Sequence, residues 1–66
     1  MVGKVDFLKM FNGRGWGFIN SKDNSANYFF HTSDTFDIIK EDDEVEFEVE
    51  NGERGPKAIN VRRRKK

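Results

Sequence analysis

Residues 14–31 read RGWGFINSKDNSANYFFH, and this stretch decides the fold. It holds two short runs rich in aromatic and branched side chains, residues 15–20 and 27–32, on either side of a polar cluster at 21–25. Runs of this length, separated by turn-forming residues, are typical of neighbouring β-strands. The stretch therefore predicts two strands joined by a turn.

The runs on either side of this stretch are of the same kind. Residues 2–11 end at Asn12-Gly13, and an Asn-Gly pair between strand-like runs is the strongest local signal for a hairpin. Residues 44–50 alternate cleanly. Their apolar face carries Val45, Phe47 and Val49, and their other face carries four glutamates. Asn51-Gly52 is a second turn signal before the last run, residues 56–61.

Five short strands in a chain of 66 residues predict an all-β fold, a five-stranded antiparallel barrel of the oligonucleotide-binding (OB-fold) type. Residues 33–43 form a longer connection with room for one helical turn. We expect a single domain over residues 1–61. We also expect a basic, disordered tail over residues 62–66.

The composition excludes several classes of protein. The chain has no cysteine and one histidine, His31, and no ligand spacing suggests a metal or a cofactor. It shows no signal peptide and no long apolar run, so we expect a soluble, cytoplasmic monomer that does not contact a membrane. No nucleophile–base pair or phosphate-binding loop points to an enzyme or a small-molecule substrate.

The charges are unevenly placed although the formal net charge is zero. Residues 41–53 hold eight acidic and no basic side chains, whereas residues 54–66 hold seven basic and no acidic ones. A basic region of this kind attracts phosphates. The acidic run is expected to be a solvated strand face.

Strand alternation sorts the aromatic residues of the second run. Trp16 and Phe18 share one face and Gly17 and Ile19 the other, because side chains alternate at a period of two. Ile19 suits a core, and Gly17 leaves room beneath the barrel wall. We therefore predict that Trp16 and Phe18 lie outside.

The same argument applies to the third run. One strand of so small a domain has only one face to bury, so Tyr28 and Phe30 are predicted inside, and Phe29 and His31 outside. Clustered exposed aromatics mark an interaction site. The predicted surface carries Trp16, Phe18, Phe29 and His31.

Basic residues flank this surface, namely Lys4, Lys9, Arg14, Arg54 and Lys57. Aromatic rings stack on unpaired bases while cations follow the phosphates. The combination predicts a site for single-stranded RNA or DNA. The alternative is a protein-interaction module, in which the same patch docks a peptide or a partner subunit.

Four segments resemble those of cold-shock domains. Residues 14–19, RGWGFI, resemble the family's first RNP motif, K-G-F/Y-G-F-I, and residues 27–31, NYFFH, resemble its second, D-V-F-V-H. Residues 52–61 are similar to the closing G-x-R-G-P-x-A-x-N-V, and Gly3-Lys4-Val5 matches the opening. The resemblance implies an OB barrel that binds single strands as an RNA chaperone or antiterminator. It also implies stacking by Trp16, Phe18, Phe29 and His31, with Arg14 and Arg54 nearby.

The segment before the first motif is two residues longer than is usual in the family. One register places Phe7 at the family's tryptophan, and another leaves Met10 there. A two-residue turn gives a third register, which pairs Phe11 with Arg14, Lys9 with Trp16 and Phe7 with Phe18. Phe7 and Lys9 fit two of the three registers, so we predict both in the site; a buried Val5 beside an exposed Phe7 requires a β-bulge.

The sequence departs from the family at Thr32, where an aromatic residue is usual, so one stacking platform is expected to be lost. The loop that follows holds Phe36. This residue either replaces the loop aromatic or fills the end of the barrel.

Overall fold

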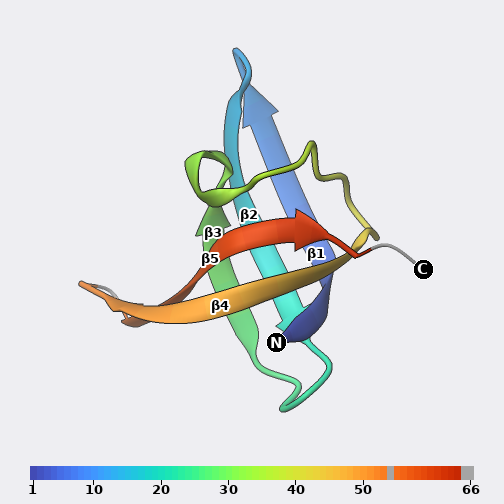
Figure 1. Ribbon diagram of the computed structural model, residues 1–66. Helices are drawn as coiled ribbons and strands as arrows, with labels where there is room; N and C mark the ends of the chain where they lie inside the picture. Colours follow the sequence, from blue (N-terminus) through green and yellow to red (C-terminus); the bar gives the residue numbers. More distant parts are fainter. Residues whose placement is uncertain (54, 65–66) are drawn as a thin grey trace.

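All five predicted strands are present in the computed structural model, which describes residues 1–53 and 55–64. They close into a barrel in the order β1-β2-β3-β5-β4, with β4 and β5 crossing the sheet of β1, β2 and β3 (Figure 1). The strands are β1 (Val2–Phe11), β2 (Arg14–Ser21), β3 (Asn27–His31), β4 (Glu44–Gly52) and β5 (Gly55–Arg63), and the 3₁₀ turn η1 (Thr32–Asp34) follows β3. The all-β, five-stranded barrel is confirmed.

The barrel closes through one parallel contact. Neighbouring strands pair antiparallel, but β3 runs parallel to β5 where Phe29 lies opposite Lys57. A second parallel bridge joins Thr35 to Val61. The predicted antiparallel barrel thus closes at a parallel junction, which joins the aromatic strand β3 to the basic strand β5.

The β1–β2 hairpin has the third of the three registers. Asn12 and Gly13 have φ angles of 52° and 78°, which suit the two central positions of a type I′ turn. Phe11 lies opposite Arg14, and the register shifts between Val5 and Phe7. The required β-bulge is confirmed; it turns Val5 into the barrel and Phe7 outward.

The core confirms most of the alternation argument. Ile19 and Phe30 are fully buried, and Tyr28 is partly buried against the core, with its ring centroid 5.7 Å from that of Phe47. Val49 shares the apolar face of Val45 and Phe47, which are buried, but remains 38% exposed. The buried set comprises Val5, Ile19, Phe30, Ile39, Val45, Phe47, Ala58 and Val61.

Gly17 has the predicted role. A Cβ at this position would clash with the backbone oxygen of Phe7 and would lie 3.0 Å from the Phe30 ring. The missing side chain lets β1 and the largest core ring approach β2. The exposed ring of Phe18 next along the strand is thereby held on a tightly packed wall.

Two boundaries differ from those expected at the β4–β5 hairpin. Gly52 is still part of β4 and pairs with Gly55 of β5, so the turn follows Asn51-Gly52 instead of being formed by these two residues. Gly55 has a φ of 112°, which glycine adopts easily. Strand β5 continues to Arg63, past residue 61, because Arg62 and Arg63 pair with β4. Lys65 and Lys66 lie outside the described residues.

Candidate nucleic-acid interface

Four aromatic rings form a continuous outer patch on β1, β2 and β3. We call Phe7, Trp16, Phe18 and Phe29 the aromatic surface. Trp16 lies at its centre, with ring centroids 5.4 Å from Phe7, 5.9 Å from Phe18 and 6.1 Å from Phe29. Phe18 and Phe29 meet edge to face at 6.0 Å. These separations are favourable for aromatic pairs, so the rings hold one another in place.

Each of these side chains remains substantially exposed. The exposed fractions are 41% for Phe7, 38% for Trp16, 37% for Phe18 and 39% for Phe29. Edges pack against neighbours while part of each ring meets solvent. Apolar area exposed in one patch marks a surface for binding another molecule.

His31 lies opposite Trp16 in the β2–β3 ladder and is partly buried. Its Nδ1 accepts the backbone N–H of Ser33 at 3.1 Å and lies 2.9 Å from the Ser33 hydroxyl. Because Nδ1 is an acceptor, the proton of the neutral ring sits on Nε2. The imidazole is thus oriented by η1 and keeps Nε2 as a hydrogen-bond donor.

Two basic side chains lie on the hairpin beside Trp16. Lys9 is opposite Trp16 and Arg14 is opposite Phe11, and both are exposed. With Trp16 and His31 they line a hollow of about 570 Å³. This places cations next to the exposed rings, as the sequence predicted.

The other described cations of the predicted site, Lys57 and Lys4, each lie near a carboxylate. Lys57 lies opposite Phe29 and lines a second hollow with Phe18, but its ammonium is 3.9 Å from a carboxylate oxygen of Glu50. Lys4 is on β1 before the bulge, with its ammonium 3.8 Å from Asp42. Arg54 lies outside the described residues.

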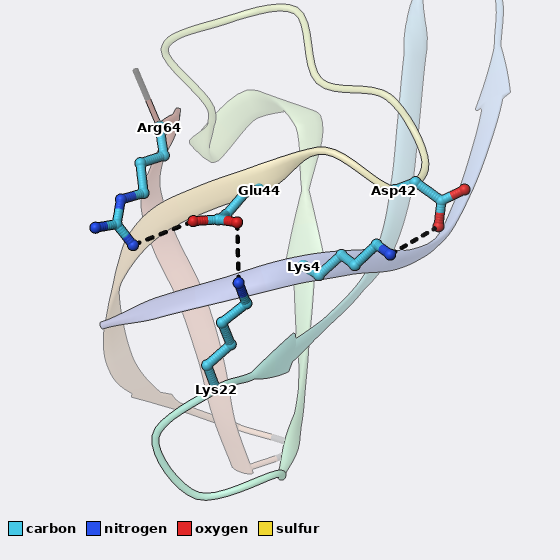
Figure 2. A network of polar contacts seen from close by, with 5 residues as sticks. All are labelled: Lys4, Lys22, Asp42, Glu44 and Arg64. Atoms are coloured by element: carbon cyan, nitrogen blue, oxygen red, sulfur yellow. Dashed lines mark hydrogen bonds and ion pairs between the residues drawn. The ribbon is translucent and has the colours of Figure 1, made fainter. Parts of the chain in front are cut away.

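A set of ion pairs lies around the start of β4 (Figure 2). Glu44 accepts from Lys22 Nζ at 2.9 Å and from Arg64 Nη1 at 3.1 Å. The cations of this region are thus held by carboxylates. In contrast, Lys9 and Arg14 make no ion pair with any residue that the structure describes.

Thr32 has a structural role at the position where the resemblance led us to expect a lost platform. Its Oγ1 accepts the backbone N–H of Gly15 at 2.9 Å, which ties η1 to the start of β2. Phe36 does not fill the barrel end, since it is 63% exposed. Its ring lies 5.3 Å from the guanidinium carbon of Arg62, and the hollows it lines contain no residue of the aromatic surface.

The sequence-based site omits one exposed aromatic residue, Phe11. It is 76% exposed and lines the same hollow as Trp16 and His31. The Asn12-Gly13 turn was the available signal, because its two-residue register already puts Phe11 on the face of Lys9 and Phe7. Because two other registers were also open, Phe11 was not predicted to belong to the site.

Some kinds of site are not found in the described part of the chain. No group of three His, Cys, Asp or Glu side chains there is arranged to hold a metal ion. Nor do residues 1–53 and 55–64 contain a helix that is long and apolar enough to span a membrane.

Comparisons with known proteins agree with this geometry. The 'Cold-shock' DNA-binding domain profile matches residues 1–64. The chain is 46% identical to cold shock-like protein CspJ of Salmonella typhimurium, over 92% of this chain and 96% of the relative. It is 44% identical to cold shock-like protein CspI of Escherichia coli, over 82% and 84%, and 44% identical to the major cold shock protein of Micrococcus luteus, over 86% and 92%. The chain therefore belongs to the cold-shock domain family and is a nucleic-acid-binding protein rather than an enzyme.

Proposed function

We propose that this protein binds single-stranded RNA or DNA by stacking unpaired bases on the aromatic surface. The observation that supports this most directly is the set of four touching rings, each 37–41% exposed, on one side of the barrel. A base in a duplex has its faces covered by its neighbours, whereas an unpaired base offers both. Each base–aromatic stack contributes about 1–3 kcal/mol and tolerates any base.

The cations beside the rings complete the proposed site. Lys9 and Arg14 line a hollow with Trp16 and would contact the phosphates of a stacked strand, and the Nε2–H of His31 is available to donate a hydrogen bond. Lys57, on β5 opposite Phe29, would add a phosphate contact in exchange for its ion pair with Glu50. Binding of this kind weakens as salt rises, because phosphate contacts release counterions.

The cellular role that follows is that of an RNA chaperone or antiterminator acting as a monomer in the cytoplasm. A protein that binds only unpaired strands shifts hairpins toward their open forms by mass action and needs no ATP. Excess protein should therefore lower the melting temperature of a weak RNA hairpin. A hairpin whose melting is unaffected at saturating protein would contradict this role.

The stacking model is tested by removing two of the rings. We expect Trp16→Ala with Phe18→Ala to weaken binding of a labelled oligo-U or oligo-dT by about 30-fold or more, since two stacks are lost. Fluorescence anisotropy of the labelled strand measures this without relying on the single tryptophan. Circular dichroism should show that the barrel persists.

Phe36→Ala is the matched control. Phe36 is also an exposed phenylalanine, but it lies beside Arg62 and away from the aromatic surface, so its loss should leave affinity unchanged. Unchanged affinity in the double variant would rule out stacking on these rings. Binding of a peptide that ignores added oligonucleotide would instead favour a protein-interaction module.

A further inference from the structure

The β1–β2 hairpin carries an exposed ring beyond the aromatic surface. The hairpin projects from the barrel, with Asn12 and Gly13 at its turn (Figure 1). Phe11, the last residue of β1, is 76% exposed and shares the outer face of Phe7 and Lys9. Four residues of strand separate Phe7 from Phe11, about 13 Å at the usual rise. Phe11 therefore extends the row of rings rather than overlapping it.

The space beside Phe11 combines two kinds of binding group. Phe11, Trp16 and His31 line a hollow of about 570 Å³ together with Lys9 and Arg14. Such a volume lies within the range of sites that hold small ligands, about 300–1,000 Å³. The two cations have no carboxylate partner among the residues described. A ring face next to unneutralised positive charge matches a nucleotide, with its flat base and anionic phosphate.

We propose that this hollow is a tip subsite, formed by Phe11, Lys9 and Arg14, for one further nucleotide of the bound strand. The base stacks on Phe11 and the phosphate lies against Lys9 or Arg14. The inference rests on the proposed function, because it takes the strand to cross the aromatic surface first. From the aromatic surface, the strand would continue along the β1–β2 hairpin. It would not continue over η1, because the Thr32 hydroxyl there already accepts the backbone N–H of Gly15.

Oligonucleotide length is the variable that tests the subsite. Oligo-U strands of increasing length are titrated into the full chain, and Trp16 fluorescence reports occupancy of the aromatic surface. In the wild type, affinity rises again when the strand becomes long enough to reach the tip. In Phe11→Ala this last gain, about 5-fold or more for one stack, is absent, while the shortest strands bind as before.

Met10→Ala is the matched control. Met10 is 51% exposed and neighbours Phe11, but it lies on the other face of β1, opposite Gly15. It should keep the wild-type length dependence. An abasic nucleotide keeps the phosphate but lacks the base. Placed at the end of the strand that reaches Phe11, it should reproduce the loss seen in Phe11→Ala; placed at the other end, it should not.

The outcomes separate this inference from the function on which it rests. Equal length dependence in Phe11→Ala and wild type would overturn the tip subsite even if Trp16→Ala with Phe18→Ala abolished binding. If that double variant bound normally, the stacking function itself would fail. A concentration-dependent dimer lost in Phe11→Ala would show that the ring contacts a second copy of the chain, and would also overturn the subsite.

Discussion

The outer faces of the two halves of the barrel differ in what they expose. Strands β1, β2 and β3 present the aromatic surface, whereas the outer face of β4 presents glutamates, among them Glu46 and Glu48. Both halves contribute to one core, since Phe30 from β3 and Val45 from β4 belong to the same buried cluster. Inner faces of both halves therefore pack one core, while the outer face of β1, β2 and β3 is the proposed binding surface.

The ion pairs show how a chain with zero net charge can still bind an anion. Lys4, Lys22 and Lys57 each have an acidic partner, supplied by Asp42, Glu44 and Glu50. The hairpin cations Lys9 and Arg14 are not paired in this way within the described structure. Carboxylates thus pair with Lys4 and Lys22 away from the rings and with Lys57 opposite Phe29, which leaves the positive charge beside Trp16 without a carboxylate partner in the described structure.

The largest expected effect is on stability, when a ring on the inner face of β3 is removed instead of one on its outer face. Phe30→Ala should cost about 3–5 kcal/mol of unfolding free energy, as is usual for a large buried ring. A single core in a domain of this size rarely supplies more than about 3–5 kcal/mol, so the variant should be largely unfolded. Urea denaturation followed by circular dichroism measures the change.

Phe29→Ala, one residue earlier, is the control for that prediction. Its ring is 39% exposed and packs across the strands with Phe18, so its loss should cost about 0.2–1 kcal/mol of stability. Oligonucleotide affinity should fall in this folded variant. If Phe29→Ala unfolded as readily as Phe30→Ala, the outer rings would have to be regarded as core.

A smaller effect should distinguish free cations from paired ones. On single strands each phosphate contact adds about 0.7 to the slope of log affinity against log salt. Lys9→Gln with Arg14→Gln should therefore lower that slope by about 1.4. The ratio of the wild-type affinity to the affinity of the double variant would then fall by up to about 25-fold when salt rises from 0.05 to 0.5 M.

Lys22→Gln is the comparison variant, because Lys22 is 2.9 Å from Glu44 and away from the rings. Its salt slope should equal that of the wild type. Equal reductions in both variants would mean that cations all over the barrel contact phosphate, and the contrast between the two faces would disappear.

Alternation alone was enough to predict the arrangement of β2 and β3. The outward positions of Trp16, Phe18 and Phe29 followed from the need to bury Ile19 and Phe30, and the structure has them so. The argument works because a strand has a strict period of two, so one secure core residue fixes the whole face.

The parts that sequence missed depend on pairing between distant segments. The parallel bridge of Phe29 to Lys57 joins residues whose relation no local pattern encodes. Alternation also puts Val49 on the same face as the buried Val45 and Phe47, but it does not tell how far along the strand that face stays covered, and Val49 is 38% exposed. Phe11 was missed for another reason: three registers of β1 were open, and its exposure depends on the one that the turn and bulge select.

The smallest expected effect concerns the ion pairs of Glu44 at the start of β4. Glu44→Gln removes the carboxylate that accepts from Lys22 and Arg64 (Figure 2), and exposed pairs of this kind contribute about 0.2–1 kcal/mol. Thermal unfolding should show that loss at low salt and almost none at 1 M salt, where screening acts over about 3 Å. The substitution also frees two cations, yet oligonucleotide affinity should change less than about twofold at 0.15 M salt, because charges more than about 8 Å apart are largely screened. A marked gain in affinity would show that the strand reaches the ion pairs around Glu44. The aromatic binding face could then no longer be separated from the acidic face of β4.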